Sequence, residues 1–230
     1  SGIATIAQKK KNKHQIIAIN AAEISTGTNS KAIINVTIIN GLGDEPLTEG
    51  CVLIKDGKIQ EVGKMSDVSI PAAAEITDAS GMYLLPGFID SHFHLDRTKG
   101  LPAKFLQHGV TSIRDPGAWI ESYDEERKSG KKIPRLFLTG PHFDMPPPAY
   151  PYDAYIVRDN YEAIKQVNAL ADQGATALKI YFRVPPGMIQ AICSTAHQRG
   201  IPVTAHLEIT EAMIAIEAGL DGVEHITSFG

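Results

Sequence analysis

The sequence predicts an α/β protein in which a β-rich N-terminal region precedes a series of alternating strands and helices. Two observations carry this prediction. Up to residue 85 the sequence shows short β-type runs separated by turn signals, and from residue 86 onward strand-like and helix-like segments alternate with short connections. We therefore divide the chain of 230 residues into a β-rich domain, 1–85, and an α/β domain, 86–230.

Composition limits the partners that this chain is expected to have. Its net charge is −4 and its isoelectric point is near 6.1, which does not indicate a nucleic-acid surface. The sequence has no run of ~18 apolar residues, so we expect no membrane partner either. Cys51 and Cys193 are far apart in the sequence and are expected to be buried thiols, although a bridge stays possible. The compartment is open: a cytoplasmic location is favoured, but the chain begins with Ser1, and a removed signal peptide would leave no trace.

The N-terminal region contains three segments of strand character. The run "AIINVTIING" is rich in β-branched residues and ends at glycine. The segment 51–63, "CVLIKDGKIQEVG", reads as two alternating strands joined by Asp56 and Gly57, which is a strong hairpin signal. The segment 74–85 continues in the same style. Together these segments predict a small β domain, or half of one.

The second region predicts six strands and five helices. The strands are expected at 84–94, 110–117, 134–141, 175–182, 201–208 and 221–228, and the helices at 102–109, 118–130, 160–174, 187–200 and 210–220. Alternation with short connections favours parallel strands, so either a doubly wound sheet or a (β/α)₈ barrel would fit. The first loop carries no GxGxxG motif, which favours the barrel.

Nitrogen-bearing side chains recur where these strands end. His92 and His94 follow the first strand, and positions i and i+2 of a strand project to the same face. Lys179 lies in the fourth strand, His206 ends the fifth and His225 ends the sixth. In a parallel barrel these strand ends form one mouth, so the five side chains should converge there. Imidazole is a common zinc ligand, and the pattern predicts one or two divalent metal ions, most simply zinc.

Lys179 has two possible roles. It lies between Leu178 and Ile180, where a buried ammonium group would be costly unless paired or modified. Addition of CO₂ to the amine would give a carbamate, and such an anionic oxygen ligand could bridge two metal ions about 3.5–4 Å apart. The alternative is a structural lysine that is paired with a carboxylate.

Three further residues are candidates for binding substrate. His142 follows the third strand and can face the mouth of the barrel. Arg183 lies just beyond Lys179, where it could hold a substrate carboxylate or form an ordinary salt bridge. Tyr181, between them, is assigned to the same group.

The motifs at the strand ends resemble those of the amidohydrolase superfamily. The resemblance rests on "PGFIDSHFH", "LKI", "TAHLE" and "VEHIT", and on the lead-in "GCVLIKDGKIQEVG", which is similar to the small β-sandwich that precedes the barrel in that family. It runs from about residue 34 to the end of the sequence. "GVTSIRD" and the third strand further resemble the imidazolonepropionase-related dipeptidases of the Xaa-Pro and Xaa-Arg types.

This resemblance implies a division of roles among the candidate residues. His92 and His94 would bind one metal, His206 and His225 the second, and carboxylated Lys179 would bridge the two. Lys179, His206 and His225 are therefore also assigned as catalytic. The implied reaction is hydrolysis of an amide-type C–N bond in a small molecule, either a peptide or a cyclic amide, by a metal-activated hydroxide.

The family also implies elements that this sequence does not contain. Its catalytic aspartate lies at the end of the eighth barrel strand, whereas this chain stops at Gly230, after the sixth. We therefore expect the open edges to be covered by a missing segment or by a second copy in a homo-oligomer. The alternative to an active enzyme is a metal-binding fragment that needs such a segment or a partner chain.

Overall fold

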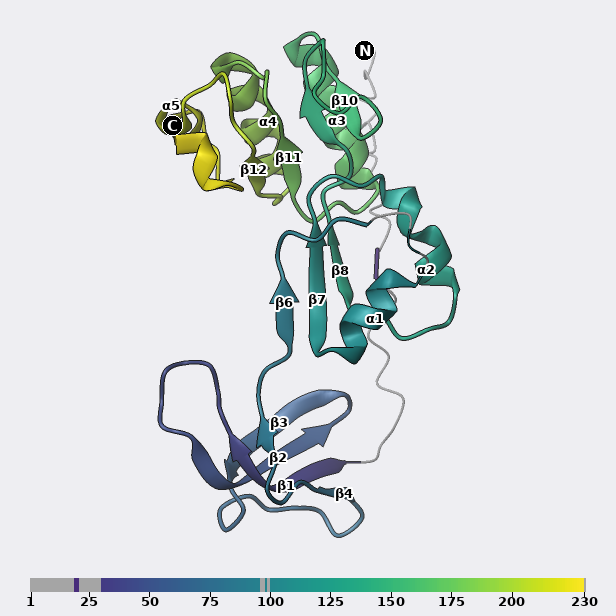
Figure 1. Cartoon of the computed structure of the whole chain (residues 1–230), viewed down its shortest axis with the longest axis vertical. Coiled ribbons are helices and arrows are strands. Elements are labelled where there is room, and N and C mark those ends of the chain that lie inside the picture. Colours follow the sequence, from purple (N-terminus) through teal and green to yellow (C-terminus); the bar gives the residue numbers. More distant parts are fainter. Residues whose placement is uncertain (1–18, 21–29, 96–97, 99, 230) are drawn as a thin grey trace, which may run out of the picture. The chain divides into compact units, whose positions relative to one another are not determined.

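The structure is a computed structural model that describes residues 19–20, 30–95, 98 and 100–229. The described residues fall into two compact units, one that ends at Phe88 and one that begins at Ile89 and also includes Asn20 (Figure 1). The two units are described separately below.

The N-terminal unit is one mixed β-sheet of five strands. These are β1 (Lys31–Ile38), β2 (Leu47–Lys55), β3 (Lys58–Lys64), β4 (Glu75–Asp78) and β5 (Tyr83–Leu84). The order is β3-β2-β1-β4, and β5 also pairs with β1. Strands β2 and β3 form the predicted hairpin, and Asp56 and Gly57 at its turn have φ angles of 51° and 70°. Such positive values at both turn residues are typical of a type I′ turn. A second sandwich layer stays a prediction.

The second unit carries two parallel arrangements of strands. Its first strands are β6 (Phe88–Asp90), β7 (Val110–Asp115) and β8 (Arg135–Leu138), in the order β6-β7-β8. The other sheet has the order β10-β9-β11-β12-β13, with all its pairs parallel, and is made of β9 (His142–Asp144), β10 (Ala154–Ile156), β11 (Leu178–Ile180), β12 (Val203–Ala205) and β13 (Gly222–Val223). The chain is thus a mixed α/β protein with parallel sheets, and closure into a barrel stays a prediction.

The predicted third strand, 134–141, is shorter in the structure, and a second short strand follows it in the other sheet. The third strand is β8, which pairs with β7, whereas β9, just beyond the predicted strand, pairs with β11. Between them Gly140 adopts a φ of 71°, a value that favours glycine. A Cβ atom there would lie 2.5 Å from Cδ2 of Leu170, so a side chain at this position would also collide with the helix behind it.

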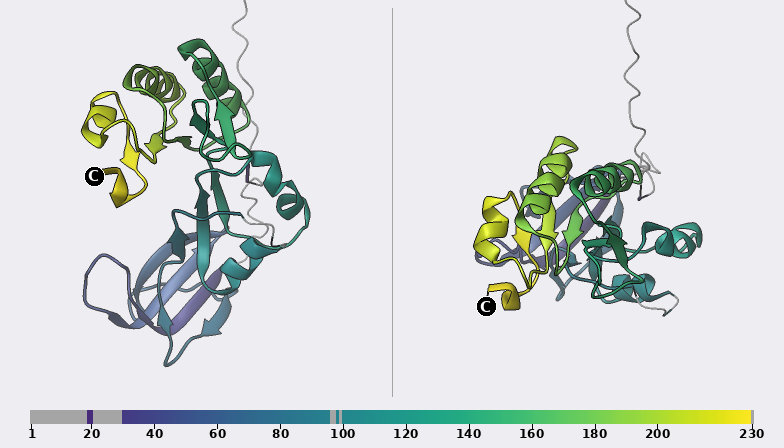
Figure 2. Two further views of the ribbon diagram at one scale, coloured as in Figure 1. Left: turned by 45° about the horizontal axis from the view of Figure 1, so that its top comes forward. Right: turned by 90° about the horizontal axis from the view of Figure 1, so that it is seen from above.

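Helices cover the second sheet. They are α3 (Asn160–Asp172), α4 (Pro186–Gln198) and α5 (Ala212–Glu217), and Figure 2 shows them following one another along the sheet. Helix α3 begins at the N-cap Asp159, whose side chain accepts from the backbone N–H of Glu162, while the Glu162 side chain accepts from the N–H of Arg158, one residue before the cap. Its buried stripe, Ala163, Val167, Leu170 and Ala171, faces the core.

The remaining helical segments are short. They are α1 (Leu101–Gln107), α2 (Asp124–Lys128), and the 3₁₀ turns η1 (Ile120–Tyr123) and η2 (Ile226–Phe229). The segment 118–130, which the sequence predicts as one helix, is therefore a 3₁₀ turn followed by a five-residue helix. In the part of the chain that the structure describes, no helix combines the length and apolar character needed to cross a membrane.

Candidate active site

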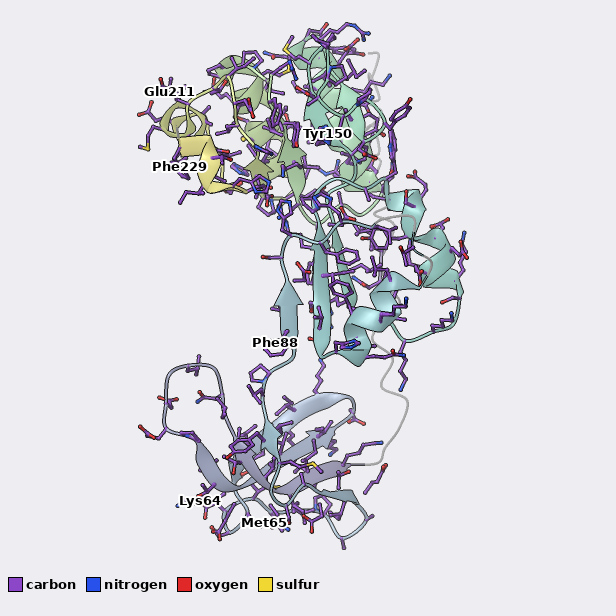
Figure 3. All side chains as sticks on the ribbon, viewed as in Figure 1. Lys64, Met65, Phe88, Tyr150, Glu211 and Phe229 are labelled. Atoms are coloured by element: carbon purple, nitrogen blue, oxygen red, sulfur yellow. The ribbon has the colours of Figure 1, made fainter. Side chains whose placement is uncertain are left out.

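A pocket lies where the ends of β6, β7, β9, β11 and β13 face one another. Its volume is about 380 Å³, and His92, His94, His142, Lys179, Tyr181 and His225 are among the residues that line it. Figure 3 shows nitrogen-bearing side chains gathered where the ends of β6 and β7 meet the sheet that contains β11 and β12. Polar groups converging on a concave site are the usual form of a small-molecule binding site.

The four imidazoles named from the sequence form a row of neighbouring rings. Ring centroids are 5.0 Å apart between His94 and His92, 4.7 Å between His92 and His225, and 4.3 Å between His225 and His206. Burial lowers the pKa of His206 to about 4, and the positive charge of neighbouring His225 acts in the same direction. Burial also lowers the pKa of His92. For His92 and His206 the neutral form of the ring, which is the form that binds metals, is therefore favoured at neutral pH.

Alternation along the segment after β6 sets the positions of the first two rings. Phe93 is buried and its ring packs edge-on against Phe105, with centroids 4.9 Å apart. The backbone N–H of Phe93 donates to Arg114 O at 2.9 Å, which holds this segment against β7. Because Phe93 points into the core, its neighbours His92 and His94 both project the other way, into the pocket.

The Nε2 atoms of His92 and His94 lie 3.2 Å apart. Each ring turns its Nδ1 atom toward a carboxylate: His92 Nδ1 is 2.8 Å from Glu224 Oε2, and His94 Nδ1 is 3.8 Å from Asp115 Oδ1. Hence both rings are oriented with Nε2 toward a common point, and the Nδ1 sides face acceptors.

Lys179 is 2% exposed and lies in the middle of β11. Burial lowers its pKa to about 8, against the opposing effect of the Glu224 carboxylate. Its Nζ atom lies 3.8 Å from Glu224 Oε1 and 5.7 Å from the centre of the Tyr181 ring. Since burial favours the uncharged amine, the site contains a lysine that is less basic than usual.

Two carboxylates of this site were missed by sequence reasoning. Glu224 precedes His225, and its carboxylate contacts His92, Arg114, Thr204 and Lys179. Burial alone would raise its pKa, but hydrogen bonds from Arg114 and Thr204 and the nearby Lys179 charge lower it to about 2. The available signal was strand alternation: if His225 faces the pocket, the residue before it faces the interior, where a glutamate requires partners.

Asp115 is the second missed carboxylate, and it shapes the loop after β7. It is fully buried and accepts hydrogen bonds from the backbone N–H groups of Leu95, Gly117 and Ala118. The Tyr123 hydroxyl donates a fourth, at 2.7 Å. The sequence signal was the "DPG" turn, in which an aspartate commonly caps the following N–H groups.

The candidate substrate residues have different surroundings. His142 is 4% exposed, lines the pocket and packs against Tyr181 with ring centroids 4.3 Å apart. Its Nε2 atom makes no hydrogen bond to any residue that the structure describes, and burial lowers its pKa to about 4. Arg183 instead lies beside Asp144: its backbone N–H donates to Asp144 Oδ1 at 3.0 Å, and its Nη1 atom is 3.7 Å from Oδ2.

The parallel strands and the histidine-lined pocket agree with a match to a known family. Residues 83–229 match the sequence model described as "Amidohydrolase family", and the chain belongs to that family. The resemblance drawn from the strand-end motifs is thereby confirmed. Members of the family hydrolyse amide and related C–N bonds, act on small molecules and generally use divalent metals.

Relatives of known structure or activity extend over most of the chain. It is 26% identical to the N-acetylglucosamine-6-phosphate deacetylase of Lysinibacillus sphaericus, over 86% of this chain and 56% of that protein. A crystal structure of a Bifidobacterium longum protein assigned as a prolidase is 26% identical, with a TM-score of 0.70 over 86% of this chain and 54% of that one. A Xaa-Pro dipeptidase with bound methionine shares the fold, with a TM-score of 0.69 at 21% identity over 88% of this chain and 63% of that one. The chain thus spans little more than half the length of these proteins.

The donor set meets part of what a divalent metal requires. Among the described residues, no three His, Cys, Asp or Glu side chains are already arranged as one metal site. The pair His92 and His94 nevertheless fits two positions of such a site. Two nitrogens that each lie about 2.0–2.1 Å from one tetrahedral zinc ion are about 3.3 Å apart, and the observed Nε2 separation is 3.2 Å. The residues present therefore fit the metal that the family uses.

Proposed function

We propose that this protein is a metal-dependent hydrolase that cleaves an amide-type C–N bond in a peptide or a cyclic amide. The observation that carries the proposal is the pair of Nε2 atoms of His92 and His94, 3.2 Å apart at a pocket of about 380 Å³. Membership of the amidohydrolase family supports the same reaction class. A completed (β/α)₈ barrel is the framework in which we place this site.

The metal ligands in this proposal come from four strand ends. His92 and His94 would hold one zinc ion through Nε2, and His206 and His225, whose ring centroids are 4.3 Å apart, would hold a second. Lys179 would bridge them as a carbamate. A bound divalent cation supplies Lewis acidity, which lowers the pKa of water to about 7 and polarises an amide carbonyl.

The chain's own residues would bind and orient the substrate. The neutral His142 ring has an unpartnered Nε2 atom among the described residues and stands beside Tyr181, so the two can direct polar groups at a carbonyl or a carboxylate of the substrate. Tyr150 packs edge-on against Tyr181, with centroids 5.7 Å apart, and lines the same pocket. We keep Arg183 as a candidate for a substrate carboxylate only if Asp144 releases it.

The proposal is tested by replacing the ligand pair and comparing it with a remote histidine. The double substitution His92→Asn/His94→Asn should remove bound zinc and abolish hydrolysis of Xaa-Pro dipeptides, dihydroorotate or hydantoin, whichever of these the wild-type protein cleaves. The matched control is His108→Asn, because His108 is exposed and its Nδ1 atom lies 2.8 Å from the backbone oxygen of Lys104, away from the pocket lining. Unchanged zinc content by atomic emission, with unchanged turnover, would contradict the proposal.

A further inference from the structure

The Glu224 carboxylate accepts hydrogen bonds from three separate segments of the chain. Oε2 accepts from His92 Nδ1 at 2.8 Å and from Arg114 Nη1 at 3.1 Å. Oε1 accepts from Arg114 Nη2 and from Thr204 Oγ1, both at 2.6 Å. With its side chain only 6% exposed, this carboxylate is fully used by protein donors.

Arg114 fixes the carboxylate in one orientation. Its guanidinium meets both oxygens of Glu224, which is the bidentate geometry that sets direction as well as distance. Nη1 also donates to Ser91 O at 3.2 Å, the residue directly before His92. The same arginine therefore holds both the carboxylate and the backbone that carries the imidazole.

This arrangement fixes which nitrogen of His92 carries the proton. An ionised carboxylate is only an acceptor, so His92 Nδ1 has to donate the hydrogen bond of 2.8 Å. In the neutral ring the lone pair is then on Nε2, the atom that faces His94 at 3.2 Å. A ring held in this way presents a metal-binding lone pair before any metal arrives.

We infer that Glu224, clamped by Arg114, is a positioning residue that fixes the tautomer and orientation of His92 for metal binding. Within the described part of the chain, neither Glu224 nor Arg114 lines the pocket, so both act through His92 and not on substrate. The inference rests on the proposed function, because it assigns to His92 the role of a metal ligand.

Asp115 shows why this role belongs to Glu224 in particular. Asp115 is also close to a candidate ligand, but its Oδ1 is 3.8 Å from His94 Nδ1 and all of its short contacts are to loop N–H groups and to Tyr123. That carboxylate therefore shapes the loop. Among the described residues, the Glu224 carboxylate is the one that makes a short hydrogen bond to an imidazole of the pair.

The test replaces Glu224 by Gln, which has nearly the same shape. Arg114 donates to both oxygens of the native carboxylate. In either orientation of the side-chain amide in Glu224→Gln, its NH₂ group therefore faces a donor where the carboxylate had an acceptor oxygen. Nitrogen-15 spectra of the metal-free full chain should show that the Nδ1–H tautomer of His92 predominates in the wild type. In Glu224→Gln this tautomer should no longer predominate. Zinc affinity, measured by competition with a chromophoric chelator, should fall about 10–100-fold.

Two comparison variants make the outcome decisive. Glu217→Gln, an exposed change of the same charge on α5, should leave the tautomer and zinc affinity unchanged. Arg114→Lys keeps the positive charge but loses the bidentate contact with Glu224, so it should also weaken zinc binding. It takes the place of Glu224→Gln as the test variant if Glu224→Gln does not fold. A dominant Nδ1–H tautomer together with wild-type zinc affinity in Glu224→Gln overturns the inference. A wild-type chain that binds no zinc instead defeats the proposed function, while the tautomer still reports on Glu224.

Discussion

The Tyr123 hydroxyl donates a hydrogen bond of 2.7 Å to Asp115 Oδ2, and both side chains are fully buried. This bond ties the 3₁₀ turn η1 to the end of β7, directly beside the pocket. Burial raises the pKa of the Tyr123 phenol, with the Asp115 charge acting in the same direction, so the phenol stays a donor throughout the ordinary pH range. The pair therefore belongs to the rigid support of the site.

Replacing Asp115 should be strongly destabilising. In Asp115→Asn, one acceptor oxygen becomes a donor among four buried donors, so we expect a loss of about 2–4 kcal/mol in the free energy of unfolding. Tyr123→Phe removes only one donor and should cost about 1–2 kcal/mol. Asp124→Asn is the control: this carboxylate pairs with Lys128 and Arg127 at the surface, and its replacement should cost far less than that of Asp115. Urea denaturation measures all three, and equal losses for Asp115→Asn and Asp124→Asn would refute the account.

Substitution by alanine should be more destabilising at Gly140 than at Gly130, which has nearly the same φ angle. Gly130 has a φ of 72° and no atom within 4 Å of a built Cβ, so Gly130→Ala should cost only the backbone strain, about 1–2 kcal/mol. Gly140→Ala adds the collision with Leu170 and should cost about 2–4 kcal/mol. Thermal or urea unfolding compares the two variants, and a difference below experimental error would show that helix α3 moves aside freely.

Because the Cys193 thiol is buried, we expect the protein to lose stability at alkaline pH. Burial raises the pKa of its thiol to about 12, and the Asp221 charge adds to the shift. In the unfolded chain a thiol ionises near about 8.5. The unfolded state therefore loses its proton first as the pH rises, and the free energy of unfolding should fall from about pH 8.5 upward by as much as ~1.4 kcal/mol per pH unit.

The measurement is the pH dependence of urea denaturation between neutrality and about pH 10, within that window. Cys193→Ala removes the thiol and should give a shallower decline, whatever its effect on stability at pH 7. Cys51, which is also buried, stays in both proteins and so cancels in the comparison. Parallel curves for the two proteins would show that the thiol makes no contribution.

The proposed carboxylation of Lys179 leads us to expect that metal binding depends on bicarbonate. If a carbamate on Lys179 bridges the metals, added bicarbonate should raise the zinc content of the protein, and native mass spectrometry should show the mass of one added CO₂. Lys179→Arg keeps a positive charge but cannot form this carbamate, so it should bind less zinc and show no response to bicarbonate. A wild-type protein that binds zinc equally with and without bicarbonate, at unmodified mass, would favour the structural lysine.

Local patterns predicted much of the fold because they act over a few residues. The hairpin at Asp56 and Gly57 and the helix from 160 onward follow from turn chemistry and capping, and both are confirmed. The third strand was harder: it ends at Leu138, and the unpredicted strand β9 begins at His142, after Gly140, whose lack of a side chain is matched to Leu170 thirty residues further along. Strand β10 was not predicted: its three residues exist as a strand only because they pair with β9.

The candidate site was predictable only in part for a similar reason. Histidines at strand ends carry a recognisable pattern, and the structure brings His92, His94, His206 and His225 together. Glu224 and Arg114 carry no such pattern. Their role comes from contacts between residues 110 apart in the chain, which periodicity cannot reveal.

The hydrogen bond between His92 and Glu224 joins residues that are 132 positions apart in the chain. The ribosome therefore synthesises His92 well before Glu224. A ribosome adding about 5–20 residues per second needs on the order of ten seconds to pass from one residue to the other. During that interval the nascent His92 ring has no carboxylate to select its tautomer. If His92 binds a metal ion as proposed, the carboxylate that would orient it becomes available only once Glu224 has been synthesised.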